Sequence, residues 1–355
     1  MSSEVLLWLS LAIPTLAAFG IWAAGSRPNL REAVTLTAAV ALWGTVLHLL
    51  ARVLRGEAPA APGFEVIGGI SLSLSIEPLG MLFALVASTL WIVNSIYSIG
   101  YMRGNNEPRQ TPFYICFAVA LASAMGVAFA DNLFTLFLFY EVLTISTYPL
   151  VAHKMNRDAL VNARIYLVLL LATSMVFLLP AIVITYVLAG TATFAEGGIL
   201  AGTGLTPTGA ALLMGLFIFG IGKAAVMPIH VWLPAAMVAP TPVSALLHAV
   251  AVVKAGVFTV VKVVVYVFGL GFLAETGASD WVVYVAGFTV IMASLIALTH
   301  DNLKKRLAFS TVSQLSYVVM AAAVATPAAI LGATLHIAAH AVSKITLFFA
   351  AGSIY

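Results

Sequence analysis

Residues 217–234, FIFGIGKAAVMPIHVWLP, place a lysine inside an apolar run and follow it with two prolines. The run is typical of a helix in lipid, where backbone polar groups must be satisfied within the segment. Proline removes a backbone donor and clashes with the preceding turn, so Pro228 and Pro234 predict that this helix breaks inside the membrane. A broken helix at this depth lies beside a cavity or another protein segment, and the carbonyl end of its first half favours a cation such as Lys223.

The composition of the chain is that of a membrane protein. Of 355 residues, 62% are hydrophobic and 8% are charged, whereas a soluble domain carries about 25% charged residues. No basic patch is interleaved with aromatic residues, so nucleic acid is not an expected partner. The single cysteine, Cys116, excludes a disulfide within the chain and a cysteine-ligated iron–sulfur cluster. The N-terminus lacks the features of a signal peptide and is expected to form the first span.

The predicted fold class is all-α, a polytopic transmembrane helical bundle of about eleven spans. Each span is an apolar run of about 20 residues, far longer than a barrel strand. The runs lie near residues 5–25, 33–51, 79–101, 112–130, 132–152, 165–189, 209–227 with a continuation past the proline, 243–268, 281–299, 307–325 and 327–354.

The connections between these runs alternate in charge, which predicts an orientation. Basic residues collect in the connections around 27–31, 103–109, 154–164 and 304–306. The alternate connections carry Arg52 and Arg55 but are otherwise acidic, with Glu57, Glu65, Glu77, Asp131, Glu196, Glu275 and Asp280. The positive-inside rule therefore predicts a multi-pass protein of the inner (cytoplasmic) membrane with its N-terminus outside. The longest connections, 52–78 and 190–208, are predicted to be short Gly-rich loops.

Several ionisable residues fall inside the predicted spans, where each charge costs about 2.5–3.5 kcal/mol on insertion scales. Glu141 has apolar or hydroxyl neighbours for two turns either way, so it must face protein or water, or be protonated. The alternative is an ion pair that locks two helices. Lys223, buried at the helix break, could bind and release a proton. The alternative for Lys223 is snorkelling to the surface.

His248 and Lys254 lie in the next predicted span. They are six residues apart, about 600° of helical rotation, so they do not share a face but could serve separate stations of one path. For a lone histidine such as His248, a hydrogen-bonded packing role is as well supported as a role in proton transfer. Lys262 lies two further turns along, near the end of the span, and is the lysine expected to snorkel.

The last predicted span contains His336, His340 and Lys344 at positions i, i+4 and i+8. This spacing places them on one stripe that rises about 12 Å along the helix. Three titratable groups in line favour a proton relay over a purely structural packing role. Zinc chelation by the two histidines is less favoured because the next group on the stripe is a cation. Two histidines one turn apart cannot bind opposite faces of one haem iron. No cofactor and no metal are therefore predicted.

Four long motifs carry a resemblance to a known family: residues 131–151, 222–256, 301–317 and 335–354. They resemble the antiporter-like subunits of respiratory complex I, of the multisubunit Mrp-type sodium/proton antiporters and of membrane-bound hydrogenases. The sequences VVKAG at 252–256 and EVLTISTYPLVAHK at 141–154 are most similar to the D-type proteins of the Mrp antiporters.

The resemblance implies a site and a domain organisation. It implies that Glu141 pairs with Lys223, that His248 and Lys254 continue the path, and that His336, His340 and Lys344 form the last part of a mid-membrane axis for protons. It implies an N-terminal three-helix region at 1–110, a first repeat at 111–270 and the start of a second inverted five-helix repeat at 271–355. Because family members usually have further spans, the second repeat is expected to be incomplete here, through truncation or completion by a partner.

The predicted function is proton translocation in a multisubunit membrane complex, with sodium or another monovalent cation as the candidate exchanged ion. Any redox chemistry would belong to partner subunits. One alternative is a membrane scaffold for a soluble partner, as in inorganic-carbon accumulation systems. A second, less favoured alternative is a haem-binding membrane redox protein.

Overall fold

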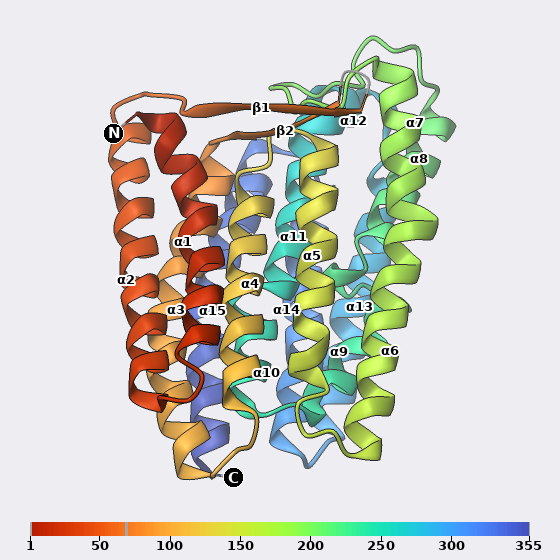
Figure 1. Ribbon diagram of the computed structural model, residues 1–355. Coiled ribbons are helices and arrows are strands. Elements are labelled where there is room, and N and C mark those ends of the chain that lie inside the picture. Colours follow the sequence, from red (N-terminus) through yellow and green to blue (C-terminus); the bar gives the residue numbers. More distant parts are fainter. Residues whose placement is uncertain (1, 68–69, 355) are drawn as a thin grey trace.

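The structure of the chain is a computed structural model that describes residues 2–67 and 70–354. Helices run up and down across one bundle, with the start of the chain at the upper end and its last residues at the lower end (Figure 1). The first helices are antiparallel neighbours, joined by short connections except between the second and the third. They are α1 (Ser3–Ala23), α2 (Pro28–Val53), α3 (Pro78–Gly104), α4 (Gln110–Ala128) and α5 (Leu133–Val151).

The second half of the bundle contains the irregular helices. A π-helical turn, η1 (Ser174–Leu178), joins α6 (Arg157–Thr173) to α7 (Leu179–Ala189). The broken segment consists of α8 (Pro207–Gly220), η2 (Gly222–Ala224), η3 (Ile229–Val231), α9 (Trp232–Ala235) and η4 (Ala236–Val238). It is followed by α10 (Thr241–Ala245), η5 (Leu246–Val250), α11 (Val252–Val263), η6 (Val264–Phe268), α12 (Leu270–Thr276), α13 (Asp280–Leu298), α14 (Leu303–Ala323) and α15 (Pro327–Ile354).

The predicted helical bundle is confirmed. Among the described residues, nine helices are long and apolar enough to cross a membrane. The other two predicted spans are the broken segment, which is divided into short helices, and α14, whose serine, threonine and glutamine side chains lower its hydropathy. Each predicted span therefore has a helical counterpart close to its expected position.

The connection 52–78 differs from the Gly-rich loop predicted there. It contains an antiparallel hairpin of β1 (Ala60–Ile67) and β2 (Ile70–Ser75), which lies across the upper helix ends (Figure 1). The hairpin is bonded to the α4–α5 connection, because the Ser75 amide donates to the Phe129 carbonyl at 2.8 Å. The alternation ISLSLS in β2 is the period of a half-buried strand and is the signal that predicts it. A Cβ at Gly63 would lie 1.4 Å from the Leu72 carbonyl oxygen, so the strands require glycine there.

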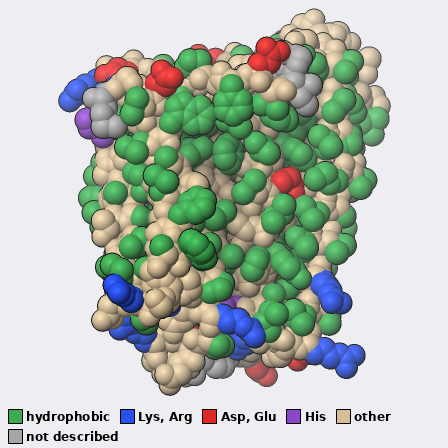
Figure 2. Space-filling model, viewed as in Figure 1, with side chains coloured by type: hydrophobic (Ala, Val, Ile, Leu, Met, Phe, Trp, Pro, Cys, Tyr) green, Lys and Arg blue, Asp and Glu red, His purple; other side chains and the backbone are tan. Residues whose placement is uncertain are grey.

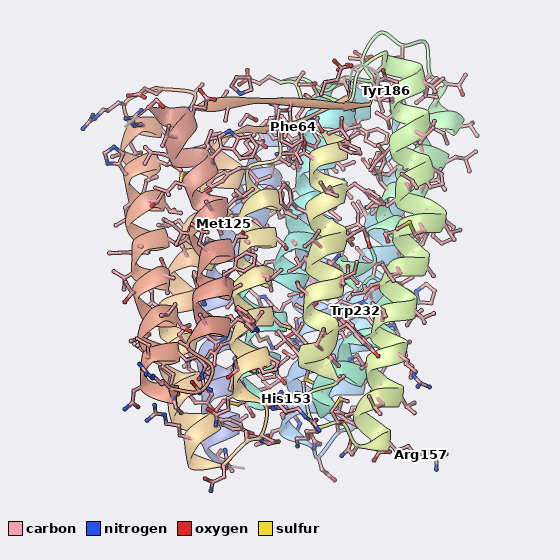
Figure 3. The ribbon with its side chains drawn as sticks, in the orientation of Figure 1. Phe64, Met125, His153, Arg157, Tyr186 and Trp232 are labelled. Atoms are coloured by element: carbon pink, nitrogen blue, oxygen red, sulfur yellow. The ribbon has the colours of Figure 1, made fainter. Side chains whose placement is uncertain are left out.

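The surface is divided as expected for a membrane protein. Hydrophobic side chains cover most of the middle of the visible face and most of the Lys and Arg side chains gather at the lower end, while Asp and Glu are seen at the upper end and also at the lower end and within the middle (Figure 2). Figure 3 labels Phe64 of the hairpin at the upper end and Arg157, at the start of α6, at the lower end. The basic connections of the sequence thus lie opposite the hairpin.

The centre of the bundle is α11. All twelve of its residues are buried, and it contacts α3, α4, α5, α8, α14 and α15. A helix that is apolar nearly all round is expected in such a position. Because α11 carries Lys254 and Lys262, both lysines are held inside protein and away from lipid.

Candidate functional site

The predicted helix break is present and brings Lys223 into the protein interior. Helix α8 ends at Gly220, the chain forms the 3-10 turn Gly222–Ala224, and Ala225 then adopts a left-handed conformation with φ of 55°. One carbonyl freed by the break, that of Gly222, accepts a hydrogen bond from Trp232 Nε1 at 2.9 Å. Trp232 lies in the lower half of the bundle (Figure 3). The interruption is therefore stabilised from within the protein.

A close approach of α11 shapes the break. A Cβ added at Gly256 would lie 2.4 Å from the Lys223 carbonyl carbon and from the Ala224 nitrogen. Real Cβ atoms do not approach backbone this closely, so only glycine lets α11 pack against the turn that carries Lys223. The break and the central helix are thus one packing unit.

Lys223 does not snorkel to the surface. Its side chain is fully buried, and Nζ donates to the Tyr140 carbonyl at 2.7 Å and to Thr144 Oγ1 at 2.6 Å. The same Nζ lies 3.0 Å from the centroid of the Tyr140 ring, within cation–π range. Tyr140 and Thr144 are four residues apart and share one face of α5, so a single face of that helix holds the ammonium group.

The direct pair of Glu141 with Lys223 implied by the resemblance is not formed. Within the described residues, no ion pair joins them and neither carboxylate oxygen of Glu141 has a hydrogen-bond partner, although Glu141 is only 7% exposed. Glu141 lies about 100° around α5 from Tyr140 and about 60° from Thr144, so it stands beside the face that holds Lys223. The two groups are neighbours that interact through space.

Lys254 of α11 and His340 of α15 are in direct contact. Lys254 Nζ lies 2.5 Å from His340 Nδ1, and both side chains are buried. A hydrogen bond between these atoms requires that one of them accept, so the pair holds either a charged lysine with a neutral imidazole or the reverse. The contact therefore joins two helices through groups that can share one proton.

The three residues of the α15 stripe have different surroundings. The rings of His336 and His340 are stacked, with centroids 6.0 Å apart and an interplanar angle of 15°. His336 is half-buried and lines a groove of about 470 Å³ with Gln314, Tyr317 and Met320. Lys344 instead turns to α14, where Nζ donates to Ser310 Oγ at 2.9 Å. The two histidine rings therefore stay together along the stripe, whereas the Lys344 side chain leaves it for α14.

His248 lies in the π-helical turn η5, which puts it in register with neither α10 nor α11. It is fully buried, its ring centroid is 4.7 Å from that of Phe348, and neither ring nitrogen has a hydrogen-bond partner among the described residues. The hydrogen-bonded packing role considered for this histidine is thus not observed. It interacts electrostatically with Lys254 and Lys344. Single π-helical turns occur frequently at functional sites.

The prediction that Lys262 snorkels is wrong. Its side chain is fully buried, forms an ion pair with Glu77 and donates to the Ala130 carbonyl at 2.7 Å. The reason is the position of α11 in the centre of the bundle, where the ammonium group is enclosed by protein and pairs with a carboxylate. Glu77, assigned from the sequence to a connection, is the N-cap residue of α3 and lies at the base of a pocket.

Sequence reasoning missed the residues that hold the buried lysines. Tyr140, Thr144, Ser310 and Glu77 are ordinary choices for an apolar helix or a helix start, so only the i, i+4 spacing of Tyr140 and Thr144 offered a signal. No group of three or more His, Cys, Asp or Glu side chains in residues 2–67 and 70–354 is arranged to hold a metal ion. His340 binds Lys254 with one nitrogen, which disfavours a histidine pair on zinc.

The fold and the buried ionisable groups define an integral multi-pass membrane protein with an antiporter-like core. The chain belongs to the NADH:quinone oxidoreductase/Mrp antiporter transmembrane family, whose profile matches residues 130–355.

Two relatives illustrate this family. The chain is 29% identical to the NAD(P)H-quinone oxidoreductase chain 5 of Synechocystis sp., with 99% of this chain and 53% of the relative covered. It is 30% identical to the Na(+)/H(+) antiporter protein of Alkalihalophilus pseudofirmus that bears the subunit letter A, with 81% of this chain and 37% of the relative covered. The chain thus spans about half or less of these relatives.

Solved structures show the same fold. A chain of the Mrp complex from Dietzia sp. DQ12-45-1b matches with a TM-score of 0.81 and 28% identity, covering 96% of this chain and 37% of that one. A chain of the membrane-bound sulfane sulfur reductase, an archaeal respiratory membrane complex, matches with a TM-score of 0.85 at 24% identity, covering 98% of this chain and 71% of that one.

Proposed function

We propose that this chain is the proton-translocating part of an antiporter-like subunit, in which protons move along a buried line of acid and base groups. The line consists of Glu141, Lys223, His248, Lys254, His336, His340 and Lys344. Protons are exchanged against sodium or another monovalent cation, as the name of the Alkalihalophilus relative suggests. The protein works with other integral membrane subunits, as the titles of the two solved complexes suggest for their chains.

The contact of Lys254 with His340 is the observation that carries this proposal. It joins α11 to α15, and therefore the first repeat to the part of the chain assigned to the second, through two groups that can share a proton. A structural ion pair would join opposite charges. Two bases in contact inside a membrane protein instead favour a site of proton transfer, since intramembrane ionisable groups commonly mark proton relays.

The neighbouring groups give the line a means of moving protons. Glu141 interacts with Lys223, and His248 and Lys344 both interact with Lys254. When one basic group of the set takes a proton, repulsion disfavours a proton on the next, so the groups titrate as a coupled system. Protonation of Glu141 removes the negative charge that holds a proton on Lys223, and the released proton moves towards Lys254 and His340.

The remaining finer assignments rest on the sequence. The motifs at 141–154 and 252–256 favour a D-type Mrp protein, although the Alkalihalophilus relative bears the letter A in its name. The basic end is assigned to the cytoplasm and the N-terminus to the outside, on the charge of the connections. Any redox reaction belongs to partner subunits.

The test is transport by the complete complex in membrane vesicles. We expect Lys223→Ala and Glu141→Ala each to lower pH-gradient-driven cation exchange at least tenfold while the complex still assembles. The matched control is Lys305→Ala, which removes an exposed lysine at the start of α14 and should leave exchange within twofold of the parent. Unchanged exchange in the Lys223→Ala complex would rule out this lysine as a proton carrier.

A further inference from the structure

A pocket at the hairpin end of the bundle is lined by three glutamates. It has a volume of about 360 Å³, and its walls come from the end of α2, the strand β2, the start of α3 and residues after α7. The charged and titratable residues that line it are Glu57, Glu77, Glu196 and Tyr266. Glu57 also lies 3.8 Å from Arg52. Three carboxylates that line one pocket raise the local concentration of protons and cations.

Lys262 lies behind this pocket and its ion pair with Glu77 closes the base. Glu77 precedes the first turn of α3, where the helix dipole favours a carboxylate. The ammonium group of Lys262 is further held by the Ala130 carbonyl and by the Phe194 ring, 4.4 Å from Nζ to the centroid. Asp131 is the other acidic group that interacts with this lysine. Lys262 is fully buried, so it meets the pocket only through the lining residues Glu77 and Phe194.

Lys262 and Lys254 lie on one face of α11 with a phenylalanine between them. Residues 254, 258 and 262 are spaced at i, i+4 and i+8, so the two lysines are about 12 Å apart along the helix. Phe258 is fully buried and packs against Phe83 of α3, with ring centroids 5.0 Å apart. Its centroid lies 5.5 Å from Lys262 Nζ. The Phe258 ring thus lies between the ion pair and the Lys254–His340 contact, and Phe83 packs against it.

We propose that the Glu77–Lys262 ion pair is a gate that admits protons from the acidic pocket to the buried line, with Phe258 and Phe83 as the barrier behind it. The proposal rests on the proposed function. A proton that reaches Glu77 neutralises the carboxylate and releases the ammonium group of Lys262. When Phe258 moves aside and water enters, Lys262 gives its proton through that water to a neutral Lys254 and takes the proton of Glu77, which restores the pair. One proton has moved inwards, and the closed gate is regenerated.

The gate is tested in vesicles that contain the complete complex. We expect Glu77→Gln and Lys262→Met each to lower exchange at least tenfold. The matched control is Glu275→Gln, which removes an exposed carboxylate of α12 that does not line the pocket, and it should stay within twofold of the parent. Equal losses in all three variants would mean a general effect of removing acidic charge and would overturn the gate.

A second measurement keeps the proposal testable if those variants do not assemble. Phe258→Ala should let an imposed pH gradient collapse several-fold faster without exchangeable cation, whereas Phe258→Leu should hold it. If the pH gradient collapses no faster in the Phe258→Ala complex than in the parent, the barrier is overturned. Wild-type exchange in Glu77→Gln and Lys262→Met, with exchange lost in Lys223→Ala, rejects the gate and leaves the proposed function standing. Wild-type exchange in Lys223→Ala as well rejects both.

Discussion

At the scale of single residues, the protein keeps Lys223, Lys254, Lys262 and Lys344 in its interior by giving each a specific partner. Lys223 has a carbonyl and a hydroxyl of α5, Lys344 has the hydroxyl of Ser310, and Lys262 has Glu77. A hydrogen bond to a charged group contributes about 1.5–3 kcal/mol, and leaving such a group unpaired costs a comparable amount or more. Lys254 differs, because its partner is another base.

The Lys254–His340 contact predicts non-additive stability. We expect Lys254→Met and His340→Leu each to destabilise the protein by about 1–3 kcal/mol, because each leaves one buried polar group unpaired. The double variant should cost less than the sum of the two, since apolar groups then fill both positions. Thermal unfolding of the purified complex measures the three values. Additive losses would show that the two side chains do not depend on each other.

At the scale of elements, the helix break is positioned by packing as well as by proline. Pro228 follows the turn that carries Lys223, while Gly256 of α11 determines how closely the central helix approaches it. The two π-helical turns that flank α11 rotate its register relative to α10 and α12. The side chain directions of His248 and Lys254 therefore could not be derived from their spacing of six residues.

The close approach at Gly256 predicts a large effect from one methyl group. Gly256→Ala should destabilise the protein by about 1–3 kcal/mol, the usual cost of overpacking, and should lower transport by displacing the Lys223 turn. Gly44→Ala is the matched control, because a Cβ at Gly44 in α2 meets nothing within 4 Å. It should be neutral or slightly stabilising. Thermal unfolding and vesicle exchange on both variants check the prediction, and equal stabilities would contradict it.

At the scale of the whole molecule, the two ends of the bundle are chemically different. The hairpin and the acidic pocket occupy one end, and the basic connections occupy the other (Figure 2). Exposed apolar side chains on α13 and α15, among them Phe288, Ile291 and Leu335, form the sides between these ends. Such sides are suited to lipid or to other membrane subunits.

The difference between the ends predicts the orientation of the chain. In a Cys116→Ser background, Phe64→Cys should react with a membrane-impermeant thiol reagent in intact cells. Arg157→Cys should react only after the membrane is made permeable. Both positions are exposed and lie at opposite ends (Figure 3). The reverse labelling pattern would place the hairpin in the cytoplasm.

The amino-acid sequence by itself determined the bundle, the positions of its spans, the helix break at Lys223 and the presence of ionisable residues within the spans. Those properties follow from local hydropathy and from proline chemistry, which act within one segment. Only the tertiary structure decided that Lys262 pairs with Glu77, that Glu141 does not touch Lys223 and that Lys254 meets His340. Each of these depends on how far apart two distant helices pack and on which face each one presents, and spacing along a single helix carries no information about either.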